Sequence, residues 1–138
     1  MRDRYLRAGL VTAVVVAGGT LVMWSAAAKK TGPTITQCKP GKPCVCNAIG
    51  ACVRTCSGPG CTFECHSTGS CTFVCPKGKC NATSDATGAT TLNCPGNGCT
   101  LSCSGVGTCT LAGCKKDCKA TCSGVGVCTN TCKDPSCS

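Results

Sequence analysis

The sequence predicts an all-β fold, a narrow disulfide-stapled β-solenoid with rungs of nine to ten residues. The chain holds 20 cysteines in 138 residues, and from Cys46 onward they recur in two interleaved columns with a period of nine to ten. Short Thr-bearing segments alternate with Gly-rich segments at the same period. Self-similarity at a fixed short period is typical of a stacked repeat array. We therefore expect one repeat domain over residues 38–137.

The N-terminal segment, 1–28, stands apart from the array and predicts a secretory signal peptide. Three arginines precede an uncharged stretch, 8–28, that ends in three alanines. A positive start, an apolar run and a small-residue ending are typical of an export signal. We expect cleavage after Ala28, which leaves a polar leader at 29–37. The alternative is an uncleaved anchor, since such a run can span a bilayer, and only then is membrane contact expected. Either way we expect a secreted or periplasmic protein, because disulfides persist there.

The strand pattern is clearest in the segment Cys61-Thr62-Phe63-Glu64-Cys65. In a β-strand, alternate side chains point to opposite faces, so both cysteines and the middle residue share one face. The middle position of the related segments is Phe73, Leu101, Leu111 or Ala120, and this face is therefore predicted to be inside. After the N-terminal segment the only aromatic residues are two phenylalanines. So few large side chains cannot build an ordinary core, and cross-links must supply the missing stability.

Gly-rich segments such as Ser57-Gly58-Pro59-Gly60 and Ser104-Gly105-Val106-Gly107 predict tight turns between the strands. Glycine supplies the positive φ angles that such reversals need. With one strand and one turn per period, the array would have eleven rungs. At about 4.8 Å per rung it would be a rod about 50 Å long. The alternative is a knottin-like set of disulfide loops without a regular ladder.

Geometry limits which cysteines can pair. Cys61 and Cys65 lie four positions apart on one strand, so their Cα atoms are about 13 Å apart, and a disulfide needs about 7 Å or less. Pairs across a turn and pairs between stacked rungs remain. One segment, 81–93, lacks a cysteine in both columns, with Asp85 and Thr90 at the missing positions, and loss of a bonded pair explains this simply. We therefore predict ten turn-closing pairs: Cys38–Cys44, Cys46–Cys52, Cys56–Cys61, Cys65–Cys71, Cys75–Cys80, Cys94–Cys99, Cys103–Cys109, Cys114–Cys118, Cys122–Cys128 and Cys132–Cys137.

The cysteine-free segment is expected to bulge outward and to be the most mobile part of the array. It contains Asn81-Ala82-Thr83, an acceptor sequence for N-glycosylation in a host that glycosylates exported proteins. Use of Asn81 therefore depends on the host.

With inward cysteines and outward threonines, the array resembles in architecture the disulfide-stapled β-solenoid antifreeze proteins of beetles. The resemblance covers the array and rests on pairs such as Cys61-Thr62 and Cys99-Thr100. That family shows a Thr doublet on each rung, whereas here only Thr129 and Thr131 form one. The Gly-rich turns are also similar to those of uncharacterised cysteine-rich repeat proteins that bacteria export. The resemblance implies a stapled solenoid and ice binding through outward threonines. The candidate surface-binding face is Thr62, Thr72, Thr91, Thr100, Thr110, Thr129 and Thr131.

No enzymatic activity and no cofactor are expected. The single histidine, His66, lies in a polar turn, and the acids that follow the N-terminal segment are scattered. These residues form no recognisable dyad or triad, so we interpret His66 as a solvated turn residue.

The positive net charge of the chain after the N-terminal segment indicates anionic partners. Without the three arginines and one aspartate of the N-terminal segment, the 14 cationic and 5 acidic residues leave a net charge of +7. Lysines cluster at Lys77 and Lys79 and at Lys115, Lys116 and Lys119. These are either solvated turn residues or a means of weak adhesion to an anionic envelope or polysaccharide surface. Nucleic acid is not an expected partner, because aromatic stacking platforms are missing.

We therefore expect an exported, non-enzymatic structural or surface-interaction protein. One alternative is an ice-binding protein that uses the outward threonines. A second is a thiolate metal-binding protein, because many cysteines with few aromatics also describe a metallothionein. The chain has no Cys-x-x-Cys motif, and export favours disulfides over thiolates.

Overall fold

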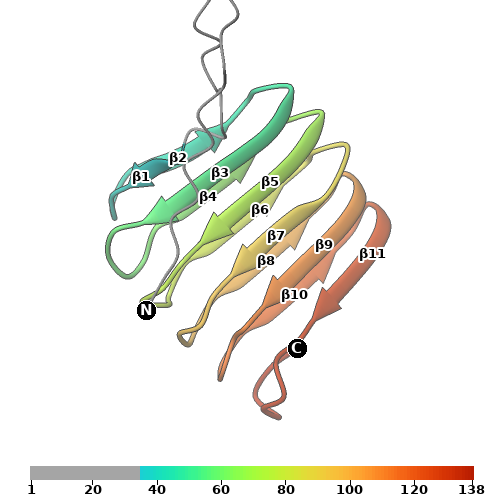
Figure 1. Cartoon of the computed structure of the whole chain (residues 1–138). Coiled ribbons are helices and arrows are strands. Elements are labelled where there is room, and N and C mark those ends of the chain that lie inside the picture. The colour runs from blue at the N-terminus through green and yellow to red at the C-terminus, as the bar shows by residue number, and fades with distance from the viewer. Residues whose placement is uncertain (1–34) are drawn as a thin grey trace, which may run out of the picture. The chain divides into compact units, whose positions relative to one another are not determined.

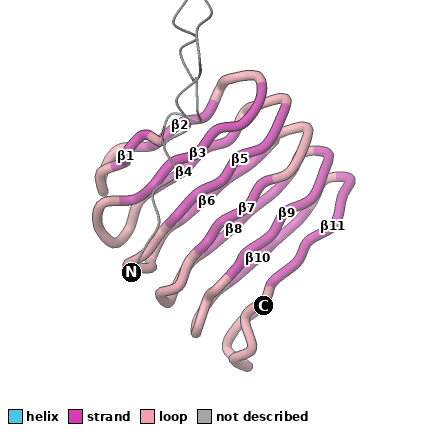
Figure 2. The backbone as a smooth tube through the Cα atoms, in the orientation of Figure 1, coloured by secondary structure: helices cyan, strands magenta, loops and turns pink. Residues whose placement is uncertain are grey.

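The computed structural model describes residues 35–138, so the predicted signal peptide and most of the predicted leader lie outside the described residues. Within this range the chain forms strands joined by turns (Figures 1 and 2), and no helix long and apolar enough to cross a bilayer is found there. The strands in chain order are β1 (Thr36–Cys38), β2 (Pro43–Cys46), β3 (Gly50–Cys56), β4 (Thr62–Cys65), β5 (Gly69–Val74), β6 (Asn81–Ser84), β7 (Thr90–Asn93), β8 (Thr100–Cys103), β9 (Val106–Ala112), β10 (Lys119–Cys122) and β11 (Val125–Asn130).

The strands form two parallel sheets that alternate along the chain. The odd sheet has the order β1-β3-β5-β7-β9-β11 and the even sheet the order β10-β8-β6-β4-β2. Thr62 lies opposite Asn81, and Asn81 lies opposite Thr100, which corresponds to about 19 residues per two-strand coil. Each coil therefore consists of an odd strand, a turn, an even strand and a second turn (Figure 1). The predicted disulfide-stapled β-solenoid is confirmed, with about 5 coils.

The period of nine to ten residues is half a coil, which corrects the predicted rung size. One short strand and one turn only reverse the chain. A second strand and a second turn are needed before the chain returns above its own start, where Leu92, for example, pairs with Phe73 in one direction and with Leu111 in the other. About 5 coils at about 4.8 Å each give a stack roughly 25 Å long, half the predicted length.

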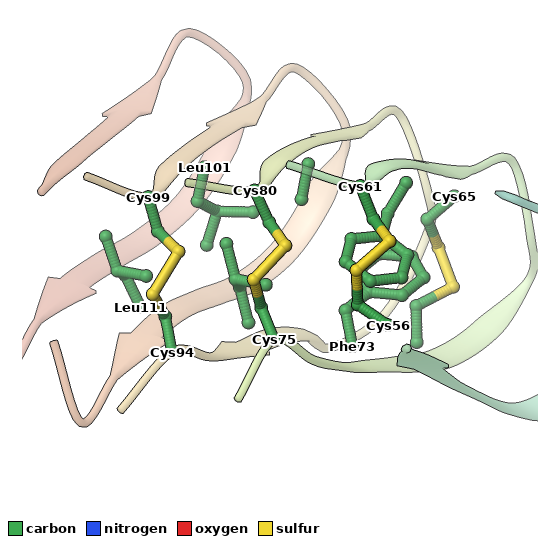
Figure 3. Close-up of a cluster of buried hydrophobic side chains, with 14 of the residues drawn as sticks. Cys56, Cys61, Cys65, Phe73, Cys75, Cys80, Cys94, Cys99, Leu101 and Leu111 are labelled. Atoms are coloured by element: carbon green, nitrogen blue, oxygen red, sulfur yellow. A yellow bond between two sulfur atoms is a disulfide. The ribbon is translucent and has the colours of Figure 1, made fainter. Parts of the chain in front are cut away.

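The core is a single layer of side chains between the two sheets. Phe63, Phe73, Leu92, Leu101 and Leu111 are fully buried. The two phenylalanine rings stack, with centroids 4.7 Å apart and planes inclined by 15°. The predicted inward position of Phe63, Phe73, Leu101 and Leu111 is therefore confirmed, and Ala120, the other predicted inward residue, is half-buried and packs against this core. Figure 3 shows how thin this layer is: the leucines and Phe73 lie beside a row of disulfides.

All cysteines of the described residues are in disulfides, and Cα–Cα distances run from 5.9 to 6.6 Å. Each bridge closes the turn between two consecutive half-coils and so joins the two sheets at an edge of the solenoid. Along one edge, sulfur atoms of successive bridges lie within 4.8 Å of one another, as the row in Figure 3 shows. The pairs are the ten expected from the sequence: Cys38–Cys44, Cys46–Cys52, Cys56–Cys61, Cys65–Cys71, Cys75–Cys80, Cys94–Cys99, Cys103–Cys109, Cys114–Cys118, Cys122–Cys128 and Cys132–Cys137.

The cysteine-free segment 81–93 keeps its place in the stack, and the predicted bulge is wrong. Ser84 is in register with Cys65 and Cys103, so Ser84 rather than Asp85 occupies the missing position. Its hydroxyl lies 2.7 Å from that of Thr90, and both residues are buried. A hydrogen bond between two buried hydroxyls thus stands where the other coils have a disulfide. Because this bond satisfies both polar groups, the segment has no reason to turn outward.

Glycine is required at the edge where even strands lead into odd strands. Gly88 has a φ of +144°, and a Cβ atom there would lie 2.1 Å from the carbonyl oxygen of Gly69 in the preceding coil. We call this the glycine edge; it comprises the turns from β2 to β3, β4 to β5, β6 to β7, β8 to β9 and β10 to β11. The coils can follow one another so closely here only because such positions lack side chains.

Candidate functional site

Four threonines form a straight ladder on the outer face of the odd sheet. Thr72, Thr91, Thr110 and Thr129 are direct register partners on β5, β7, β9 and β11. Neighbouring strands in a sheet are about 4.8 Å apart, so hydroxyl and methyl groups repeat at that interval. We call these four residues the threonine ladder.

The outward positions beside the ladder are uncharged. One flanking column contains Ser70, Thr108 and Val127, and the other contains Val74, Asn93 and Ala112. The outer face of β5, β7, β9 and β11 is therefore a regular surface of small polar and apolar groups.

The seven threonines of the predicted face do not share one surface. Thr72, Thr91, Thr110 and Thr129 lie on the odd sheet, and Thr131 directly follows β11, where its amide donates to Leu111 O. Thr62 and Thr100 lie on β4 and β8 of the even sheet. Consecutive strands of the chain belong to different sheets, so residues one half-coil apart face opposite sides.

The lysines gather on the edge opposite the glycine edge. This edge comprises the turns from each odd strand to the next even strand, together with the segment that follows β11, and all eight lysines of residues 35–138 lie in it or directly beside it. All eight are exposed. Asp117 and Asp134 lie there too, so the edge has a clear excess of positive charge. We call the following residues the lysine edge: Lys39, Lys42, Lys77, Lys79, Lys115, Lys116, Lys119 and Lys133.

His66 is exposed, as expected of a solvated turn residue, but it also pairs with an acid of the next coil. Its Nδ1 lies 2.9 Å from both carboxylate oxygens of Asp85, and its Nε2 lies 3.6 Å from Glu64 Oε2. Asp85 accepts the hydrogen bond from Nδ1 and attracts the imidazolium charge, and both effects raise the pKa of His66 above 6.5.

Sequence reasoning missed this cluster, because His66 and Asp85 are a full coil of about 19 residues apart. A period of nine to ten does not bring these two positions together. The signal that could have found them is the alternation of the two sheets, which doubles the period at which residues become neighbours.

The cluster does not have the geometry of a nucleophilic dyad. Ser104 continues the column of His66 and Asp85 one coil further, but its hydroxyl donates to Ser84 O at 3.5 Å. Among the hydrogen bonds found in residues 35–138, none joins a serine hydroxyl to His66. A serine nucleophile needs such a bond to its base.

The cysteines offer no thiolate in this oxidised form, because each of them, from Cys38 to Cys137, is bonded to another. The metal-binding alternative that rests on thiolates therefore applies only to reduced protein.

Comparison with known proteins finds nothing similar: no protein-family model, no curated protein and no solved structure matches this chain. The functional interpretation therefore depends on the surfaces described above.

Proposed function

We propose that this chain is an exported, non-enzymatic surface-interaction protein that adheres to anionic polymers, such as acidic polysaccharides, through its lysine edge. The observation that carries the proposal is the collection of all eight lysines of the described residues on one edge of the solenoid. These lysines belong to turns that are far apart in the sequence. They form a row in the structure because the odd-to-even turns stack above one another.

The spacing along the edge suits a linear polyanion. Lysine-bearing turns two coils apart, such as 76–79 and 115–118, are separated by about 10 Å along the stack. This distance slightly exceeds the Debye length of about 8 Å at physiological salt, so successive lysine-bearing turns act as largely separate contacts along a polyanion. Single exposed ion pairs contribute little, and adhesion therefore depends on several lysines acting together.

The disulfides support this function by holding the turns in place before a partner arrives. Bridges Cys75–Cys80 and Cys114–Cys118 each close one of the lysine-bearing turns. A preorganised backbone loses less conformational entropy on binding than a flexible one. A rigid row of cations then needs only the side chains to become ordered.

Binding to immobilised dextran sulfate, with neutral dextran as reference, tests the proposal. We expect K77Q/K79Q to weaken binding several-fold, and added salt to weaken binding of the native protein. The matched control is N47D/S123D, which lowers the net charge by the same amount at two exposed positions in turns of the glycine edge. Equal losses in the two variants would show that net charge alone matters and would contradict the proposal.

Ice binding is the second candidate, favoured by the threonine ladder. Thr72, Thr91, Thr110 and Thr129 present a regular uncharged surface with a repeat of about 4.8 Å. If the candidate is correct, the native protein shows thermal hysteresis, T91K/T110K loses it, and K77Q/K79Q retains it. A native protein without thermal hysteresis removes this candidate and leaves the lysine-edge proposal untouched.

A further inference from the structure

Glu64 and His66 place a carboxylate and an imidazole side by side on the outer face of the even sheet. The residue between them, Cys65, points inward to its disulfide with Cys71, so alternation sends both neighbours outward. Oε2 of Glu64 and Nε2 of His66 are 3.6 Å apart. This is too long for a good hydrogen bond. It is close to the separation of about 3.4 Å expected for two donors that each lie about 2.1 Å from a tetrahedral Zn²⁺.

Asp85 fixes the orientation of the imidazole. Nδ1 of His66 donates to the Asp85 carboxylate at 2.9 Å, and the Asp85 amide donates to Cys65 O at 3.1 Å, which secures Asp85 to the same strand. In a neutral imidazole with its proton on Nδ1, the lone pair is on Nε2 and faces Glu64. Metal-binding histidines commonly donate their second nitrogen to a carboxylate in this way.

A shallow hollow of about 200 Å³ adjoins the imidazole. It is lined by His66 and Asp85 and by the hydroxyl-bearing residues Thr83, Ser84, Ser102 and Ser104. The space admits water molecules, and the hydroxyls provide hydrogen-bond partners for them. Glu64 is not among the residues that line the hollow, but the side chains of His66 and Glu64 are themselves 46% and 34% exposed. Solvent can therefore complete the coordination of an ion held by only two side chains.

From this geometry we infer that Glu64 and His66 bind a divalent transition-metal ion such as Zn²⁺, with Asp85 as the positioning residue. One imidazole and one carboxylate suit Zn²⁺, Ni²⁺ or Cu²⁺, whereas Ca²⁺ and Mg²⁺ prefer oxygen ligands alone. The site does not depend on the proposed adhesion, because it uses none of the lysines.

The single histidine of the chain makes the first test direct, because every imidazole signal belongs to His66. The oxidised protein with ¹⁵N-labelled histidine is titrated with ZnCl₂ to millimolar concentration at pH 7. We expect a saturable shift at Nε2 with one ion per chain, while Nδ1 stays protonated. The absence of a saturable change would overturn the inference, whatever the behaviour of any variant.

Variants assign the roles of the two acids. E64Q keeps the size of the side chain and removes the ligand charge, and we expect at least a ten-fold loss of zinc affinity. D85N is expected to weaken affinity and also to let the Nδ1 proton signal exchange faster, which a merely structural role would not do. D117N, which removes an acid at the lysine edge, is the control and should bind zinc as the native protein does. Unchanged affinity in E64Q would overturn the assignment.

Discussion

At the scale of single residues, Ser84 and Thr90 show what a coil needs at the glycine edge. The two hydroxyls are 2.7 Å apart in the position that Cys65–Cys71 and Cys103–Cys109 occupy in the neighbouring coils. The sequence separation of six is the same in all three coils. A buried contact that joins the two strands is therefore retained even where the covalent bond is not.

We predict that S84C/T90C forms an eleventh disulfide. The backbone already holds the two positions as it holds the native pairs, and closing such a short loop stabilises by about 2 kcal/mol in the chain-entropy model. Intact mass, thiol titration and thermal unfolding measure the result. The variant should show no free thiol and a higher melting temperature, whereas S84C alone should show one thiol. Two free thiols in the double variant would mean that the register at Ser84 is wrong.

The pKa of His66 is expected to fall toward its ordinary value in D85N, because the Asp85 hydrogen bond is the largest cause of the upward shift. A raised pKa in the folded protein means that protonation of His66 favours folding. This contribution is present below the pKa of the unfolded chain, and it is lost as pH rises through the folded-state pKa. An NMR titration of the metal-free protein measures both pKa values. Equal values in the native protein and D85N would contradict the pairing.

At the scale of elements, the turn at the glycine edge constrains the fold as strongly as the strands do. Gly88 combines a positive φ with close backbone contact to Gly69, whereas Gly41 has a φ of +86° and a Cβ atom there would meet nothing within 4 Å. A side chain at Gly41 would therefore cause conformational strain alone, whereas a side chain at Gly88 would cause strain and also a steric clash with the preceding coil.

G88A is predicted to destabilise the protein by more than G41A. Both substitutions place alanine in a left-handed conformation, at about 1–2 kcal/mol, and only G88A also forces two coils apart. Thermal unfolding of the two variants under oxidising conditions measures the difference. Equal losses would show that the coils at this edge can separate freely.

Much of each half-coil is predictable from the sequence, because alternation within a strand is a local property. The inward Phe63 and Leu101 and the turn-closing cysteines follow from it. The pairing of half-coils into coils is not predictable in this way, because the pattern of a strand is the same in either sheet. For that reason the sequence pattern groups Thr62 with Thr72 and gives no sign that His66 lies beside Asp85.

At the scale of the whole array, the interior is too small to hold the fold without its bridges. Phe63, Phe73, Leu92, Leu101 and Leu111 are the largest fully buried apolar side chains of residues 35–138. Neighbouring coils are held together mainly by backbone hydrogen bonds and by this thin layer. In such arrays each repeat is stable through its neighbours, so loosening any coil also weakens the coils on either side.

We predict that full reduction by dithiothreitol unfolds the protein without denaturant. Ten short loops at about 2 kcal/mol each exceed the usual net stability of a small domain. Circular dichroism and ¹H–¹⁵N spectra, before and after reduction, measure the loss of strand structure. A reduced protein that retains native spectra would show that burial alone is sufficient.

Every disulfide of the described residues spans only four to six positions and closes a turn, so none joins residues that are stacked above one another in successive coils. A pulling force on the two ends would therefore peel the stack open from its termini. The disulfide-closed loops remain closed during this process. The extended length of one released coil is therefore roughly 40 Å, instead of roughly 65 Å for the same chain without disulfides. Such a molecule lengthens in small steps and keeps each released loop in its folded geometry, ready to rewind when the load is removed.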